Sequence, residues 1–211
     1  MKKNIIFVIP AFNEEKNIKK VILDFKKIGK VLVVNDYSTD KTKSIASKYS
    51  NYIINNKYNK GYDKSLRIGL KYAVNKIKNS KVIFSIDGDG QHLSRDVKKF
   101  IKKINKNDVI IGKRNFYNRI SEYFVGFFSK IFDNISDPLC GMKCYKKKYL
   151  SYLFKDLKET DYIGMFFLKR NNNISEVNID VKKNKYTNFG YGFKTDIRII
   201  FTYFKIKFFL S

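Results

Sequence analysis

Short apolar runs alternate with segments of helical period along the first half of the chain. Five runs have the length and composition of buried strands, at residues 5–9, 31–34, 52–54, 82–86 and 109–111. Between them, apolar side chains recur at i, i+3, i+4 and i+7, as Ile18, Val21, Ile22 and Phe25 do. This alternation is typical of βα units. It predicts an α/β, Rossmann-like fold with a mostly parallel central sheet flanked by helices.

The second half of the chain departs from this alternation. After about residue 115, an aromatic-rich stretch of helical period at residues 120–135 leads into Asp137-Pro138-Leu139-Cys140-Gly141. We therefore expect an irregular α+β second half. The 211 residues suit one compact domain, and no repeat of fixed period indicates a solenoid.

The last residues of the chain form a separate amphipathic pattern. Residues 197–210 are mostly apolar or aromatic, and Arg198, Thr202 and Lys205 share one sector of a helical wheel. A helix of this length reaches roughly 21 Å, which is shorter than a bilayer's hydrocarbon core of about 30 Å. We expect the tail to lie on a membrane without crossing it. The alternatives are packing on the domain's own core and a subunit contact.

The formal net charge of +25 is the largest departure from an average composition. Such a charge can indicate a nucleic-acid partner or an anionic membrane. However, Lys is spread along the chain with abundant Asn, Ile, Tyr and Phe, as an A+T-biased coding sequence would produce, and no nucleic-acid-binding signature accompanies it. We therefore expect no nucleic-acid partner, and peripheral contact with a membrane.

Soft metal ligands are scarce in this sequence. Cys140, Cys144 and His92 are the only cysteines and histidine, which excludes a zinc site of soft ligands, and the two cysteines are expected to fill the core. His92 is expected to pack or to form a hydrogen bond beside the acidic residues that precede it, and the alternative is that it approaches a metal ion there. The apolar run before Pro10 is too short for a secretory signal, so we expect a cytoplasmic protein.

Polar clusters follow three of the predicted strands. They are Pro10, Asn13 and Glu14 after the first strand, Asn35, Asp36 and Ser38 after the second, and Asp87, Asp89, Gln91 and His92 after the fourth. Ligands of open α/β sheets bind outside the carboxyl ends of the strands. These clusters therefore predict one acid-rich cleft.

The run Asp87-Gly88-Asp89-Gly90 has the residue types of a metal and diphosphate site. Two carboxylates one residue apart can hold a hard cation, and the glycines let a phosphate approach the backbone. A cation there would offset the charge on a departing nucleoside diphosphate. A plain turn is the alternative for this run alone, because Asp and Gly are common turn residues.

Three motifs together resemble family 2 glycosyltransferases of the GT-A fold. They are Ile9-Pro10-Ala11-Phe12-Asn13-Glu14-Glu15, Val34-Asn35-Asp36-Tyr37-Ser38-Thr39-Asp40 and Asp87-Gly88-Asp89-Gly90-Gln91-His92. Residues 59–67, 111–114, 137–143 and 176–179 resemble, in order, later motifs of the polyprenyl-phosphate (dolichol-phosphate mannose synthase-like) branch. The resemblance covers about residues 4 to 195. It implies a catalytic domain at residues 1–195, with the acceptor side in its second half, and an amphipathic tail at 196–211.

The resemblance also implies roles for single residues, which we list by the part of the substrate that they would contact. Pro10, Phe12 and Glu14 would line the nucleotide pocket, Asp36 would hold the base, Asp87, Asp89 and Gln91 would lie at a Mg²⁺ or Mn²⁺ ion with Gly88 beside the diphosphate, and Arg114 and Arg119 would face phosphate oxygens. Asp137 would be the general base.

Some positions depart from the family's pattern. Asn35 replaces the first acid of the usual pair, Tyr62-Asp63-Lys64 follows Gly61 where a glycine-rich stretch is usual, and an acidic pair is not evident at residues 161–168. A lipid phosphate, with a second pKa near about 6, is already anionic at neutral pH and needs positioning more than deprotonation, whereas a sugar hydroxyl needs a base.

The sequence thus predicts transfer of a hexose from a UDP- or GDP-sugar to a polyprenyl phosphate, with metal and with inversion, in cell-envelope synthesis at the inner face of the cytoplasmic membrane. The alternatives are transfer to a hydroxyl of a cell-surface glycan, a basic nucleic-acid-binding protein without enzymatic activity, and a catalytically idle relative. Formation of a homo-oligomer stays open.

Overall fold

The computed structural model describes residues 4–117, 119–156, 165, 173–182 and 193–209. At its centre is a seven-stranded sheet in the order β3-β2-β1-β4-β6-β5-β7. The strands are β1 (Ile5–Ala11), β2 (Lys30–Asn35), β3 (Tyr52–Asn55), β4 (Val82–Ser85), β5 (Val109–Lys113), β6 (Lys143–Lys146) and β7 (Ile174–Asn178). Residues 161–168, where the family's pattern has an acidic pair, lie outside the described residues except for Met165.

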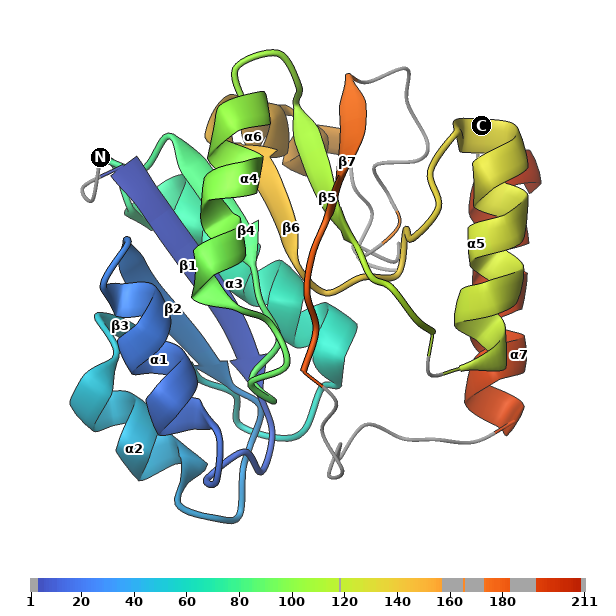
Figure 1. The fold of residues 1–211 in the computed structure, drawn as a ribbon. Coiled ribbons are helices and arrows are strands. Elements are labelled where there is room, and N and C mark those ends of the chain that lie inside the picture. Colours follow the sequence, from blue (N-terminus) through green and yellow to red (C-terminus); the bar gives the residue numbers. More distant parts are fainter. Residues whose placement is uncertain (1–3, 118, 157–164, 166–172, 183–192, 210–211) are drawn as a thin grey trace.

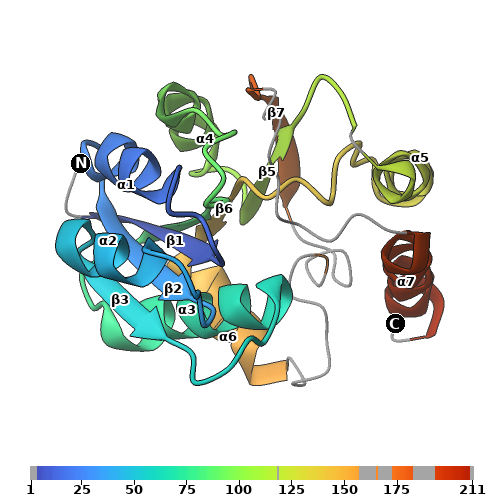
Figure 2. The same ribbon diagram turned by 90° about the horizontal axis from the view of Figure 1, so that it is seen from below.

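Helices cover both faces of this sheet (Figure 1). One face carries α1 (Ile18–Lys26), α2 (Thr42–Tyr49) and α4 (Val97–Lys103), and the other carries α3 (Tyr62–Lys76) and α6 (Lys147–Asp156). The view from below separates these layers (Figure 2). The predicted α/β fold is confirmed.

Every strand pairing in the sheet is parallel except those of β6, which runs antiparallel to both β4 and β5. The end of β5 and the start of β6 therefore meet, and the Gly112 amide donates to the Met142 carbonyl over 2.9 Å. The chain between them leaves the sheet and returns to the same place. We did not predict β6, because Lys143-Cys144-Tyr145-Lys146 lacks a long apolar run.

The core explains why the first strands could be predicted. All seven residues of β1 are buried, since helices cover both of its sides. On one side Phe7 packs against Phe25 and Phe84, with ring centroids 4.9 and 5.2 Å apart. On the other side α3 approaches so closely that a Cβ on Gly69 would lie 2.4 Å from a Val8 methyl carbon.

Two helices stand apart from these layers, at the β7 end of the sheet (Figures 1 and 2). They are α5 (Ile120–Asp133) and α7 (Phe193–Phe204), and a short π-helical turn, Lys205–Phe209, follows α7. The tail thus forms a helix, as predicted, and it packs on α5, burying Ile199, Tyr203 and Ile206. None of the described helices is long and apolar enough to span a membrane.

Candidate functional site

The loops that follow β1 and β2 are fastened to one another. The Asn13 amide donates to Ser38 Oγ over 3.1 Å, and Asn13 Oδ1 accepts from the Thr39 amide over 2.9 Å. The Glu14 amide donates to Thr42 Oγ1 over 2.7 Å. Two of the three predicted polar clusters therefore lie together at the carboxyl ends of their strands.

Asp36 fixes the segment that leads into α3. Its carboxylate is buried and accepts three hydrogen bonds, from the Asn56 side-chain amide at 2.7 Å and from the backbone amides of Lys60 and Gly61 at 2.9 and 2.8 Å. Pro10 is buried within β1, whereas the Phe12 ring after β1 is exposed. A contact of Asp36 with a nucleobase stays a prediction, and it would add to these internal bonds.

Asp87 lies just beyond the end of β4 and is held from two sides. The Tyr62 hydroxyl donates to Oδ1 over 2.6 Å, and His92 Nε2 lies 3.0 Å from Oδ2. Burial would raise the pKa of Asp87, but the His92 and Tyr62 contacts and the Lys143 charge outweigh it and lower that pKa to about 2. Asp87 is therefore a fixed anion at neutral pH.

Asp89 and Glu14 carry the opposite shift. Burial, together with the Asp87 charge, raises the pKa of Asp89 to about 6, although one of its oxygens accepts from the Gln91 amide over 2.9 Å. Burial and the charges of Asp89 and Asp87 raise the pKa of Glu14 to about 7, against the Asn17 hydrogen bond that lowers it. Three neighbouring carboxyl groups thus oppose one another's ionisation, which a bound cation would relieve.

The described residues hold no group of three His, Cys, Asp or Glu side chains arranged as a complete metal site. A magnesium-like ion needs only one or two protein carboxylates when a substrate's phosphates and water supply the other oxygens. Gly88 brings the backbone of the acidic motif close to the end of β1 and the loop after it, because a Cβ there would lie 3.2 Å from the Pro10 carbonyl oxygen and 3.5 Å from Glu14 Cγ. The residues fit a cation that arrives with a diphosphate.

Gly141 presses against Asp87 from the second half of the chain. A Cβ at this position would lie 2.0 Å from Asp87 Oδ2, and the Gly141 carbonyl accepts from Ser85 Oγ over 2.7 Å. The antiparallel pairing of β4 with β6 brings the two segments together. The motif at residues 137–143 therefore borders the acidic centre.

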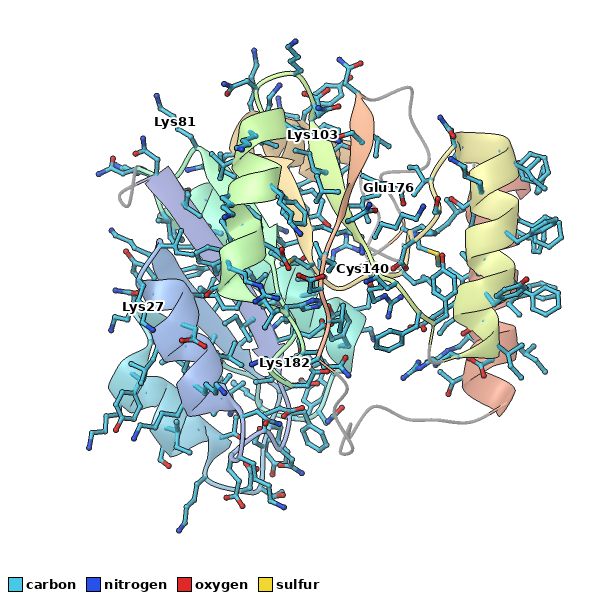
Figure 3. All side chains as sticks on the ribbon, in the orientation of Figure 1. Lys27, Lys81, Lys103, Cys140, Glu176 and Lys182 are labelled. Atoms are coloured by element: carbon cyan, nitrogen blue, oxygen red, sulfur yellow. The ribbon has the colours of Figure 1, made fainter. Side chains whose placement is uncertain are left out.

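Arg114 sits at the end of β5 among acids. Its Nε and Nη2 donate to the two oxygens of Asp137 over 2.7 and 2.8 Å, and its Nη1 donates to Glu122 over 3.0 Å. Asp137 is buried, and its backbone amide donates to Glu176 over 2.9 Å. Glu176 lies on β7, on the side that faces α5 (Figure 3). The structure thus joins Arg114 to Asp137, whereas the sequence led us to expect a phosphate at one and a proton transfer at the other.

Arg119 is the residue that precedes the first turn of α5. Cys140 and Cys144 are buried free thiols, as expected. His92 forms the hydrogen bond beside the acidic residues that we expected. Its other ring nitrogen, Nδ1, is buried with no hydrogen-bond partner among the described residues.

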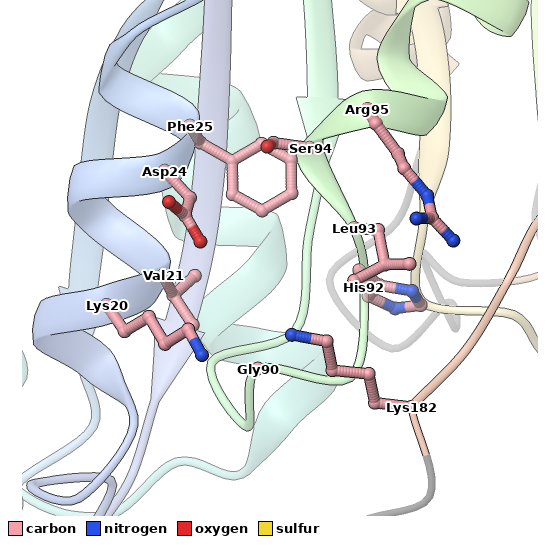
Figure 4. Close-up of a pocket in the computed structure, with 10 residues that line it drawn as sticks. All are labelled: Lys20, Val21, Asp24, Phe25, Gly90, His92, Leu93, Ser94, Arg95 and Lys182. Atoms are coloured by element: carbon pink, nitrogen blue, oxygen red, sulfur yellow. The ribbon is translucent and has the colours of Figure 1, made fainter.

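A small cavity lies behind the acidic motif, between α1 and residues 90–95 (Figure 4). It has a volume of about 120 Å³ and is lined by His92 and Gly90 together with Lys20 and Lys182, which reach toward its opening from opposite sides. Its size suits water or a small ion rather than a nucleotide, because clefts for ligands of that size are several times larger.

Sequence reasoning missed four residues of this region: Tyr62, Glu122, Lys143 and Glu176. Tyr62 was visible as a departure from a glycine-rich stretch, and Glu176 lay in a recognised motif, but neither signal revealed its partner. Lys143 is buried within β6, where its ammonium donates to the Cys140 carbonyl. The pairing of Glu122 with Arg114 depends on the position of α5 beside β5, which periodicity does not predict.

Comparison with known proteins gives one consistent result. The family model described as glycosyl transferase family 2 matches residues 6–177. An uncharacterized protein of Methanocaldococcus jannaschii is 32% identical over 84% of this chain and 87% of its own. The UDP-N-acetylglucosamine–dolichyl-phosphate N-acetylglucosaminyltransferase of Methanococcus voltae is 29% identical over 94% of this chain and 95% of its own.

Among solved structures, glucosyl-3-phosphoglycerate synthase of Mycobacterium tuberculosis in complex with Mn²⁺, UDP and phosphoglyceric acid has the same fold. The TM-score is 0.72 at 16% identity, over 97% of this chain and 78% of the other. At this identity the likeness concerns the fold alone, which is the GT-A fold expected from the sequence.

Proposed function

This chain belongs to glycosyl transferase family 2, and we propose that it transfers a hexose from a UDP- or GDP-sugar to a polyprenyl phosphate, with a divalent metal ion and with inversion. The observation that carries the proposal is the meeting of Glu14, Asp87 and Asp89, whose opposed ionisation suits a cation bound with a diphosphate. The Methanococcus voltae relative, which acts on dolichyl phosphate, supports the acceptor class.

The donor side rests on the loops after β1, β2 and β4. Asp89 is the carboxylate that we assign to Mg²⁺ or Mn²⁺, with Gln91 beside it, because Asp87 already accepts from Tyr62 and His92. Asp87 would then contribute to the ion's site its negative charge and a lone pair that Tyr62 and His92 leave unused. When bound, the ion would act as a Lewis acid toward the departing nucleoside diphosphate.

The nucleotide would lie over the ends of β1 and β2. We assign Pro10, Phe12 and Glu14 to its pocket, Asp36 to the base and Gly88 to the diphosphate. The internal bonds of Asp36 support this, because they hold its carboxylate in one orientation before any ligand arrives.

The acceptor side rests on Arg114 and Asp137. A polyprenyl phosphate is already an anionic nucleophile, so it needs a positioned cation more than a base. Asp137, with both oxygens on Arg114, suits a residue that positions this guanidinium. Arg119, at the start of α5, is a second candidate for phosphate oxygens. A sugar hydroxyl as acceptor would instead require Asp137 to leave this pair and act as the general base.

A lipid acceptor would place the reaction at a membrane. We propose peripheral contact with the inner face of the cytoplasmic membrane through the tail at residues 196–211, and a role in cell-envelope synthesis. Residues 1–195 would form the catalytic domain. Family membership favours this enzyme over the non-enzymatic nucleic-acid-binding rival.

A radiolabelled transfer assay tests the proposal. UDP- and GDP-hexoses are offered with Mg²⁺ or Mn²⁺, and with polyprenyl phosphate and a free oligosaccharide in parallel. We expect label in the lipid fraction, lost on chelation and in Asp89→Asn, because the variant lacks the charge that we assign to the ion. Asp24→Asn, whose carboxylate bonds to the exposed Lys27, is the matched control and keeps activity. Label only in the oligosaccharide contradicts the lipid acceptor.

Calorimetric titration of the same nucleotide sugars, with and without each metal ion, separates binding from turnover. Metal-dependent binding by the parent without transfer to either acceptor would indicate a catalytically idle relative. Salt-dependent binding of DNA or RNA without any binding of nucleotide sugars would favour the nucleic-acid rival.

A further inference from the structure

The helix α5 buries small side chains and exposes most of its large apolar ones, which is the reverse of the usual amphipathic helix of a globular protein. Its buried residues are Ser121, Val125, Gly126 and Ser129, none of them larger than valine, whereas its large apolar side chains are exposed except Phe128, which is partly buried. Ile120, Phe124, Phe127 and Ile131, at i, i+4, i+7 and i+11, are between 48% and 63% exposed. A helix that only packed on its own domain would bury its large apolar side.

The exposed apolar side continues onto α7 and the turn after it. Ile197 and Phe201 are 47% and 74% exposed, and Phe208 in the turn is 53% exposed. Phe132 of α5 is 45% exposed and contacts Phe208, with ring centroids 5.5 Å apart. We call this continuous surface of α5, α7 and the turn the apolar face.

The apolar face is unusual for this molecule. Nine of the fourteen large hydrophobic side chains that are exposed among the described residues belong to it. It lies on two helices that stand away from the sheet layers (Figures 1 and 2), and ring side chains stand out from α5 on the side away from the sheet (Figure 3). A concentration of this kind marks an interaction surface.

The acids of these two helices are turned inward and already bonded. Glu122 pairs with Arg114, Asp133 accepts from Lys207 and Tyr203, and Asp196 accepts from Ser121. The exposed charged side chains of the described helices α5 and α7 and the turn are cationic, and they are Lys130, Arg198 and Lys205. The surface therefore combines large apolar side chains with positive charge.

We propose that the apolar face docks the protein on an anionic lipid bilayer, with α5 and α7 lying along the surface. Aromatic and aliphatic side chains would enter the interface while Lys130, Arg198 and Lys205 meet the headgroups. A second copy of the chain fits less well, because two chains of net charge +25 would repel one another across this face. A negatively charged bilayer is complementary to both properties.

This docking extends the expected tail contact to α5, and it has a consequence that rests on the proposed function. Arg114 bonds to Glu122 in the first turn of α5, and Tyr117, which lies between them in the chain, has its ring 5.9 Å from the Arg114 guanidinium. A bilayer on the outer side of α5 would therefore lie about 10 Å, one helix diameter, from the cation that we assign to the acceptor's phosphate.

Vesicle flotation of the full chain tests the docking. The vesicles contain phosphatidylcholine with or without phosphatidylglycerol, and no nucleotide or acceptor is present. We expect the parent to bind the anionic vesicles and to release as salt rises. Phe127→Ser combined with Ile131→Ser should weaken this binding by at least about tenfold, because two interfacial side chains are removed.

The controls separate docking from folding and from catalysis. Leu23→Ser, at a 40% exposed position on α1, should bind vesicles like the parent. The thermal unfolding midpoint of the double variant should not fall, because both side chains are already exposed. Binding of nucleotide sugars without vesicles should also be unchanged, so that a failure of the proposed function would appear there and not in flotation.

Three outcomes would overturn the proposal. One is a parent protein that does not bind anionic vesicles, and another is a double variant that binds as tightly as the parent. The third is a dimer of the parent, seen by light scattering without lipid, that the double variant converts to monomer, since the face would then join two copies.

Discussion

Arg114 and Asp137 form a two-point ion pair at the end of β5, with Nε to Oδ2 at 2.7 Å and Nη2 to Oδ1 at 2.8 Å. The Asp137 side chain is 1% exposed and the Arg114 side chain 11%. Such a fork holds the guanidinium plane in one orientation. The pair suits a site in which Asp137 positions a cation for an anionic acceptor.

Asp137→Asn should therefore act through Arg114. An amide offers one acceptor oxygen in place of two, so we expect a loss of about 3 kcal/mol in unfolding free energy. In the transfer assay the acceptor KM should rise while the acid limb of the pH profile stays in place. A lost kcat at unchanged KM, with that limb abolished, would make Asp137 a general base. Asp108→Asn, whose partly exposed pair with Lys146 spans 3.4 Å, should cost less than about 1 kcal/mol.

Gly141→Ala tests whether the second half of the chain shapes the donor site. The new Cβ would meet the Asp87 carboxylate at 2.0 Å and displace it without changing any charge. We expect metal-dependent binding of nucleotide sugars to weaken by at least about tenfold, the equivalent of one lost charge-assisted contact. Gly126→Ala is the control, since its Cβ would meet the Ser136 carbonyl at 2.6 Å beside α5. Equal affinity in Gly141→Ala and the parent would contradict this role.

Tyr62→Phe removes one hydrogen bond from Asp87 and leaves the ring. The pKa of Asp87 should rise, because that hydroxyl stabilises the ionised form over 2.6 Å. Calorimetry should show donor affinity reduced by up to about tenfold, and most strongly at low pH, where the remaining charge is lost first. Tyr72→Phe on the same helix, whose ring contacts Tyr52, should leave affinity unchanged.

The early strands and the acidic motif could be predicted because their signals are local. β1 and β2 are continuous apolar runs, and Asp87 and Asp89 follow such a run directly. The parallel arrangement then places their ends at one edge of the sheet. Neither step needs knowledge of a distant part of the chain.

The second half could not be predicted in the same way. β6 carries the buried Lys143. A lysine is usually a surface residue, and only its hydrogen bond to the Cys140 carbonyl explains its burial. The pairing of Arg114 with Asp137 joins residues 23 positions apart and depends on the register of β5 with β6. Periodicity carries no information about such partners.

The raised pKa values of Glu14 and Asp89 predict how the metal-free protein responds to pH. Each group binds its proton more tightly in the folded state than in the unfolded state, so it stabilises the fold at low pH. That contribution is lost as pH rises, between ordinary carboxyl values and about 6 for Asp89 or about 7 for Glu14. Asp87, with its pKa lowered to about 2, adds no slope in this window.

Thermal unfolding without metal should therefore show a midpoint that falls between about pH 5 and 7.5, and Glu14→Gln should flatten the fall. Mn²⁺ with a nucleoside diphosphate should reverse it, because affinity for a cation rises as these carboxyls ionise. A midpoint that rises over this window in the parent and in Glu14→Gln alike would contradict the assignment.

The meeting of Gly112 with Met142 has a consequence for how relatives of this chain can diverge. The chain leaves the sheet at the end of β5 and returns to it at Met142, whose carbonyl is hydrogen-bonded to Gly112 of β5. The pairing of β5 with β6 therefore does not depend on the residues between them. Insertions, deletions and replacements within the stretch that carries α5 are tolerated by such a framework, since Arg114 before it and Asp137 to Gly141 after it need not move. Evolution can thus exchange the segment that carries α5, together with whatever that segment recognises, while the donor half keeps its geometry.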